Sequence, residues 1–250
     1  MENNLMFLLA VIALLLVFFT FSNYSFKSEI ISTNSSTTTT TQPITLQSSQ
    51  RTVVMKVPAV DNDGNGVVTL LKVEARDGEG RVLADVNNLL FWVDTQYSIR
   101  TAQRVAQSDV SVNISNVDLI YGIETNATLI EGPSAGASLT VATIAALENK
   151  SLNPNVMITG TINPDGTIGP VGGIAEKAKA AKDVGANLFL VPEGQGTQTS
   201  YRPVENCTKY GSMTYCTTEY KKEKVDISKS VGIEVKEVAT VEEALKYFLT

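Results

Sequence analysis

The sequence of 250 residues contains no histidine. This absence excludes Ser-His-Asp and Cys-His catalytic arrangements and the usual histidine-containing zinc sites. Any proton transfer must therefore use lysine, aspartate, glutamate, tyrosine or a thiol. The net charge is −6, and acidic and basic residues are interspersed. The basic patch that nucleic-acid binding requires is missing. We accordingly expect no nucleic-acid partner, no metal and no cofactor.

Cysteine is nearly absent, with only Cys207 and Cys216 in the whole sequence. Eight residues separate them, in a polar stretch. The plain interpretation is a structural disulfide that closes a short loop and stabilises it by about 2–3 kcal/mol. If the domain is cytosolic, the alternative is a pair of free thiols.

Charge is also lacking from residues 5–21, LMFLLAVIALLLVFFTF, which are almost purely apolar. A helix of this length spans about 25 Å, just enough to cross the hydrocarbon core of a bilayer. A cleaved signal peptide is the alternative, but no small-x-small cleavage site follows and no lysine or arginine precedes the run. We therefore expect residues 1–26 to be an uncleaved, single-pass membrane anchor.

Residues 27–51 are predicted to be a flexible linker, because the Ser/Thr-rich stretch 32–42 has no apolar residue to pack. Six Asn-x-Ser/Thr sequons also occur. A solvated linker, sequons and a close cysteine pair together suit an extracytoplasmic domain. The sequons begin at Asn23, Asn34, Asn113, Asn126, Asn149 and Asn206.

Hydrophobic periodicity predicts an α+β domain with some α/β pairing over residues 52–250. Strands 52–60, 67–76 and 81–86 are expected to form a β-meander. Residues 193–230 are polar and without clear pattern, so they are interpreted as an insertion. The other predicted strands are 111–114, 125–130, 156–162, 187–191 and 232–238, and the predicted helices are 96–107, 134–148, 174–184 and 241–249.

Ser134 begins the helix 134–148 directly after Gly132-Pro133, among small neighbours. A helix N-terminus has free backbone N–H groups and the positive end of the helix dipole. The backbone at Gly132, Ser134 and Ala135 could therefore stabilise an oxyanion beside an exposed serine hydroxyl. The alternative is that Ser134 has no catalytic role and is only a small residue at a tight helix start.

Lys177 lies one turn into the helix 174–184, after Gly172-Gly173. A lysine can act as a general base only when it is neutral, which requires burial to lower its pKa from about 10.4 toward 7–8. Lys179 and Lys182 on the same helix remain competitors. Thr159 ends the preceding strand, and its hydroxyl could accept a hydrogen bond from the lysine.

These three segments, GPSAG at 132–136, TG at 159–160 and PVGGIAEK at 170–177, resemble in order and spacing the proteolytic domain of Lon proteases, peptidase family S16. The resemblance implies that Ser134 is the nucleophile, that Lys177 is its base and that Thr159 supports the lysine. It implies the Lon proteolytic-domain fold, which is similar to the ribosomal protein S5 domain 2-like fold, and a homo-oligomer such as a hexameric ring.

The sequence departs from the Lon pattern in places. Thr161 follows the TG where Lon usually has an acidic residue, and Glu131 stands where many Lon enzymes carry aspartate, so Glu131 could tune or gate the site. The 250 residues contain no G-x-x-x-x-G-K-[ST] loop, the signature of an ATPase. The expected function is ATP-independent hydrolysis of peptides or unfolded proteins at a membrane surface. The alternatives are a non-catalytic Lon-fold scaffold and a self-processing protease.

Overall fold

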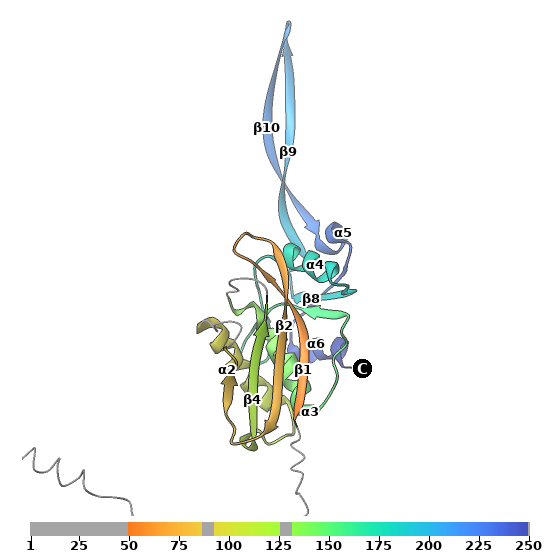
Figure 1. The fold of residues 1–250 in the computed structure, drawn as a ribbon. Coiled ribbons are helices and arrows are strands. Elements are labelled where there is room, and N and C mark those ends of the chain that lie inside the picture. The colour runs from red at the N-terminus through yellow and green to blue at the C-terminus, as the bar shows by residue number, and fades with distance from the viewer. Residues whose placement is uncertain (1–49, 87–92, 126–131, 250) are drawn as a thin grey trace, which may run out of the picture. The chain divides into compact units, whose positions relative to one another are not determined.

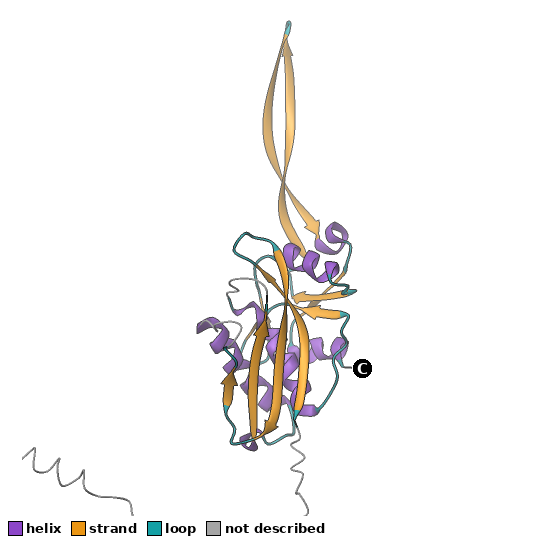
Figure 2. Ribbon diagram, in the orientation of Figure 1, coloured by secondary structure: helices purple, strands orange, loops and turns teal. Residues whose placement is uncertain are grey.

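The computed structural model describes residues 50–86, 93–125 and 132–249, and these form an α+β domain, as predicted (Figures 1 and 2). The larger sheet has the strand order β1-β2-β4-β3, in which the first three strands are antiparallel and β3 runs parallel to β4. Residues alternate between buried and exposed along β1 and β2, as expected for a sheet with one face against a core. The strands are β1 (Arg51–Val60), β2 (Gly66–Asp77), β3 (Val82–Ala84) and β4 (Val117–Glu124).

Helix α3 (Gly136–Glu148) is the centre of the domain. It packs against β1 and β2, and α2 (Val93–Asp109) lies beside it. Every residue of α3 from Gly136 to Leu147 is buried, which confirms the prediction of a central helix from its small and branched residues. Within this core the hydroxyls of Tyr121 and Thr143 form a 2.9 Å hydrogen bond.

The domain also contains a second sheet of three parallel strands, in the order β11-β8-β5. Helix α4 (Ile174–Asp183) contacts both β8 and the strands β1 and β2 of the larger sheet. A short antiparallel pair, β6 with β7, connects β5 to α4. The remaining elements of this part are β5 (Val156–Ile158), β6 (Thr161–Ile162), β7 (Ile168–Gly169), β8 (Leu188–Pro192), β11 (Glu234–Val238) and α6 (Val241–Phe248).

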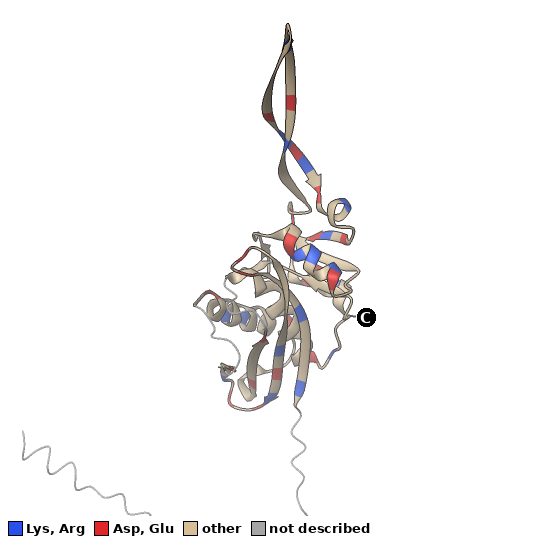
Figure 3. Ribbon diagram, turned by 45° about the horizontal axis from the view of Figure 1, so that its top comes forward, with Lys and Arg blue, Asp and Glu red and all other residues tan. Residues whose placement is uncertain are grey.

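The predicted insertion at 193–230 is mostly a long hairpin of β9 (Thr197–Tyr210) and β10 (Met213–Asp226), drawn in light blue in Figure 1. Nearly all of its residues are exposed, and charges of both signs alternate along it (Figure 3). Helix α5 (Ile227–Val231) then returns to the body of the domain, where Ile227 is buried. The two strands were not predicted from the sequence, because strands exposed on both faces carry no hydrophobic period.

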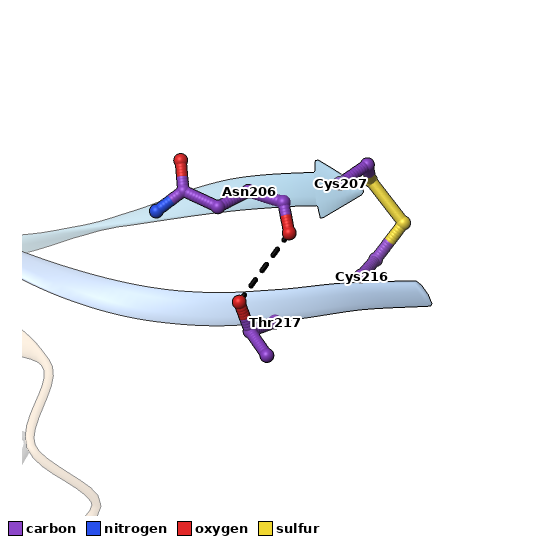
Figure 4. The surroundings of a disulfide bond; sticks show 4 residues. All are labelled: Asn206, Cys207, Cys216 and Thr217. Carbon is purple, nitrogen blue, oxygen red and sulfur yellow. Dashed lines mark hydrogen bonds between the residues drawn. A yellow bond between two sulfur atoms is a disulfide. The ribbon is translucent and has the colours of Figure 1, made fainter. Parts of the chain in front are cut away.

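The cysteine pair lies near the tip of this hairpin (Figure 4). Cys207 and Cys216 are directly opposite each other in the strand register, with Cα atoms 4.0 Å apart, and they form a disulfide. Next to them, the Thr217 hydroxyl donates a 3.3 Å hydrogen bond to the Asn206 carbonyl oxygen. The predicted disulfide is therefore present, and it joins the two strands of an otherwise isolated ribbon.

Several predicted elements need correction. The first three strands are not a meander, because β3 pairs with β4 and not with β2. No strand occurs at 111–114, where the chain turns into the 3-10 helix η1 (Ile114–Asn116), capped by the Asn113 side chain. Strand β4 went unpredicted, and the predicted strand at 125–130 lies, after Thr125, outside the described residues.

The predicted anchor at 1–26 and nearly all of the linker at 27–51 also lie outside the described residues. Among the residues that the structure does describe, no helix is long and apolar enough to cross a membrane.

Candidate active site

Ser134 lies in a 3-10 turn, η2 (Pro133–Ala135), immediately before α3, and its residue is half-buried. The predicted helix start at Ser134 is thus a tighter turn, and the α-helix proper begins at Gly136. In a 3-10 turn the N–H of residue i faces the carbonyl of residue i−3, so the N–H of Ala135 faces Gly132. Pro133 has no N–H, and none of the described residues accepts a hydrogen bond from the N–H of Ser134.

The serine turn is fixed to the end of β5 by a set of short hydrogen bonds. The Ser134 carbonyl oxygen accepts from the Gly160 N–H at 3.0 Å and from the Thr159 hydroxyl at 3.3 Å. In return, the Ala137 N–H donates to the Gly160 carbonyl at 3.0 Å. Thr159 is fully buried, and its hydroxyl holds the serine turn in place through the hydrogen bond to the Ser134 carbonyl. The expected hydrogen bond from the lysine to Thr159 is absent among the described residues.

Gly136 allows this close approach. A β-carbon at this position would lie 2.7 Å from the backbone nitrogen of Ile162, a distance that real β-carbons do not show. The small residue therefore lets α3 start against the strand that follows Thr159 and Gly160.

Helix α4 presents Lys177 to the interior. Gly173, in the left-handed conformation with φ 68°, precedes the helix and accepts the Lys177 N–H at 2.9 Å. The Lys177 residue is only 4% exposed. Its ammonium has no hydrogen-bond or ion-pair partner within the described ranges. Burial lowers the pKa of Lys177 from 10.5 to about 8, and the neighbouring Glu176 carboxylate opposes the change.

The two competing lysines of α4 have other roles. The Lys179 side chain is 72% exposed, and its Nζ lies 2.8 Å from Asp183 Oδ2. The Lys182 ammonium donates to the Val231 carbonyl at 2.7 Å on the surface. Of these three lysines, only Lys177 is buried, because Ile174, Lys177, Ala178 and Ala181 share the helix face that packs on the domain.

Ser134 and Lys177 open onto the same pocket, which has a volume of about 380 Å³. The serine turn and the segment that leads into α4 both line it. Thr161, which stands where Lon usually has an acidic residue, also lines it. The lining residues are Gly132, Pro133, Ser134, Thr161, Pro170, Val171, Gly172 and Lys177. Glu131, the other residue predicted to tune the site, lies outside the described residues.

Sequence reasoning missed one residue next to this pocket. Gln195, between β8 and β9, makes two hydrogen bonds to the backbone of Val171: its Oε1 accepts from the N–H at 2.9 Å, and its Nε2 donates to the carbonyl at 2.8 Å. The only sequence signal is a glutamine that follows the Pro192–Gly194 turn. Its backbone partner, 24 residues away, has no sequence signature.

The arrangement places an alcohol at a helix end and a buried amine of lowered pKa on two walls of one small pocket. An amine of lowered pKa near an alcohol is chemically able to accept the proton of that alcohol. Residues 94–209 match the family model of the Lon protease (S16) C-terminal proteolytic domain. This part of the chain is therefore similar to the proteolytic domain of Lon proteases, in agreement with the resemblance of the three motifs.

Curated relatives include an archaeal Lon protease from Thermoplasma acidophilum, which is 37% identical over 81 residues, 32% of this chain and 12% of the relative. A Lon protease from Lawsonia intracellularis is 33% identical over 135 residues, 51% of this chain and 16% of the relative. A Lon protease from Lachnoclostridium phytofermentans is 38% identical over 76 residues, 30% of this chain and 9% of the relative. The chain thus matches less than a fifth of the length of these three proteins.

Proposed function

We propose that this protein is a serine endopeptidase in which Ser134 is the nucleophile and Lys177 its general base. The observation that carries the proposal is the shared pocket: of the three lysines on α4, the one that is buried and without an ionic partner among the described residues faces the same 380 Å³ space as Ser134. A structural lysine would extend to solvent, as Lys179 does.

In the proposed reaction, neutral Lys177 removes the proton from the Ser134 hydroxyl as the oxygen attacks the carbonyl carbon of a peptide bond. The tetrahedral oxyanion is stabilised by the positive end of α3 and by the backbone N–H of Ser134. Protonated Lys177 then donates its proton to the leaving amine, which gives an acyl-enzyme ester at Ser134. Water, deprotonated by Lys177, hydrolyses the ester and regenerates the serine.

The proposed substrates are peptides or unfolded segments, because only an extended chain can bring its backbone into so small a pocket. Cleavage by these 250 residues should need no ATP, since they contain no phosphate-binding loop. We further propose a homo-oligomer such as a hexameric ring, which light scattering coupled to gel filtration would measure.

The test is cleavage of an unfolded protein such as casein by the full chain in mild detergent, with and without ATP. Ser134→Ala and Lys177→Ala should each lower kcat by at least about 10³-fold while leaving the fold intact. Lys179→Ala is the matched control and should cleave like the wild type. If folded wild-type protein and both site variants are equally inactive, the scaffold alternative replaces this proposal.

Mass spectrometry of the purified chain tests the alternative that the protein is a self-processing protease. A defined cut that is present in the wild type and absent in Ser134→Ala would show that the enzyme cleaves itself.

We also propose that residues 5–21 hold the peptidase domain at the extracytoplasmic face of a membrane. The apolar run supports the anchor, and the disulfide between Cys207 and Cys216 suits an oxidising compartment. The sequon residue Asn206 is exposed on the hairpin. Glycan mapping and thiol labelling in intact cells would test this, and free thiols with unmodified sequons would contradict it.

A further inference from the structure

The two-point contact between Gln195 and Val171 lies between the candidate active site and the hairpin. Val171 is part of the pocket wall, directly before Gly172 and the start of α4. Gln195 satisfies both the N–H and the carbonyl of Val171, as a neighbouring strand would. A side-chain amide is well suited to this, because it offers one donor and one acceptor.

Gln195 is itself held in place from several sides. Its backbone N–H donates to the Pro192 carbonyl at 3.1 Å, at the end of β8. The next residue, Gly196, donates its N–H to Glu237 Oε1 at 2.7 Å and accepts the Ile227 N–H at 3.0 Å. The base of the hairpin is therefore joined to β8, to β11 and to the start of α5, so Gln195 extends from a fixed support.

We propose that Gln195 is a positioning residue for the peptidase site, which holds the segment 170–172 so that Lys177 stays buried and directed into the pocket. The inference rests on the proposed function, because positioning matters only if Lys177 acts on Ser134. It goes beyond that function by assigning a role to a residue outside the pocket lining.

Gln195 can influence Lys177 because the segment that it holds directly precedes helix α4. Residues 170–172 lead straight into Gly173, which accepts the N–H of Lys177 and so sets the first turn of α4. If Val171 is released, this turn can shift and more water can surround the ammonium. Among the described residues, Glu176 is the one charged group that influences Lys177, and it lies on the same helix. Burial is thus what keeps this lysine a base, and a fixed wall maintains burial.

Three variants of the full chain test the proposal. Gln195→Met keeps the length of the side chain and removes both hydrogen bonds. Gln195→Glu keeps the acceptor and removes the donor, while Gln195→Asn keeps both groups on a shorter side chain. Gln198→Met, at an exposed position of β9, is the matched control. Circular dichroism and thermal melting establish how much of each variant is folded.

We expect Gln195→Met to lower kcat per folded molecule by about 10- to 100-fold with a much smaller change in KM, because misplacement by about 1 Å has effects of this size. The acidic limb of its pH–kcat profile should move to higher pH, since a hydrated Lys177 regains a higher pKa. Gln195→Glu should be intermediate, and Gln198→Met should match the wild type. A folded Gln195→Met with wild-type kcat and pH profile would overturn the proposal, as would a loss that only follows the folded fraction.

A second measurement separates failure of this proposal from failure of the proposed function. Competitive acetylation with mass spectrometry gives the pH at which Lys177 becomes reactive, and it requires no turnover. If the wild type cleaves nothing, the proposed function fails. The titration of Lys177 then still decides whether Gln195 keeps this lysine buried: a shift to higher pH in Gln195→Met supports that link, and an unchanged titration refutes it.

Discussion

Replacing Lys177 with methionine should make the protein more stable at neutral pH while abolishing its activity. The lysine is buried, and its ammonium has no ionic partner within the described ranges. Methionine is similar in length, flexible and apolar, so it can occupy the same space without the charge. The difference in unfolding free energy between the variant and the wild type therefore measures the cost of burying a charged amine in this pocket.

The magnitude follows from the pKa of Lys177, which is about 8 in the folded protein and 10.5 ordinarily. Such a difference corresponds to roughly 3 kcal/mol of unfolding free energy, because each pKa unit is worth about 1.4 kcal/mol. Between pH 8 and pH 10.5 the unfolded chain binds more protons than the folded one, so stability rises with pH there. Below pH 8 the penalty is fully present, and above pH 10.5 it is gone.

Urea unfolding of the wild type and Lys177→Met at pH 7 and at pH 10.5 measures this difference. We expect Lys177→Met to gain roughly 3 kcal/mol at pH 7 and almost nothing at pH 10.5. Lys179→Met, whose ammonium is exposed and pairs with Asp183, should stay within about 1 kcal/mol at both values. A loss of stability at pH 7, or a gain independent of pH, would show that Lys177 is not held as a desolvated amine.

Three further changes test the surroundings of the site and the hairpin. Thr159→Val removes the hydroxyl that binds the Ser134 carbonyl, so kcat should fall about tenfold and stability by about 1 kcal/mol, and unaltered kinetics would refute a positioning role. Gly136→Ala should lower the unfolding free energy by about 2 kcal/mol in urea melts, because its β-carbon meets Ile162; a neutral effect would mean that α3 can shift. Reducing the Cys207–Cys216 disulfide should speed amide hydrogen exchange in the hairpin by up to about 100-fold, equivalent to about 2–3 kcal/mol, yet leave the global melting temperature nearly unchanged. A large fall in melting temperature would show that the hairpin supports the core.

The sequence was sufficient to predict those parts of the site that depend on local pattern. Ser134 follows Gly-Pro just before a helix, Thr159 follows a strand, and Lys177 lies one turn into a helix. In the structure Ser134 contacts Thr159 and lines the same pocket as Lys177. The residue pattern alone left Lys177, Lys179 and Lys182 open, because the buried face of α4 depends on β1, β2 and β8, and only the resemblance to Lon singled out Lys177. Gln195 could not be found, because it binds a backbone distant in sequence.

The fold shows the same division. Elements with a clear amphipathic or wholly apolar pattern, such as α3 and β1, were predicted to within a few residues. Strand β4 is buried along most of its length and interrupted by Gly122, so it lacks the alternation of a half-buried strand. The hairpin strands are exposed on both faces, so they lack the alternation because polar residues occupy both faces.

The hairpin has a consequence for how the protein behaves at high concentration. Within the described part of the chain, β9 pairs only with β10, so each strand has one open edge of 14 residues, about 46 Å long. Open edges are templates on which other chains can add strands and aggregate. Pro203 in β9 and the lysines 221, 222 and 224 in β10 are the residue types that oppose such growth. Replacing these residues with apolar ones would therefore allow the hairpin to nucleate fibres without altering the candidate active site.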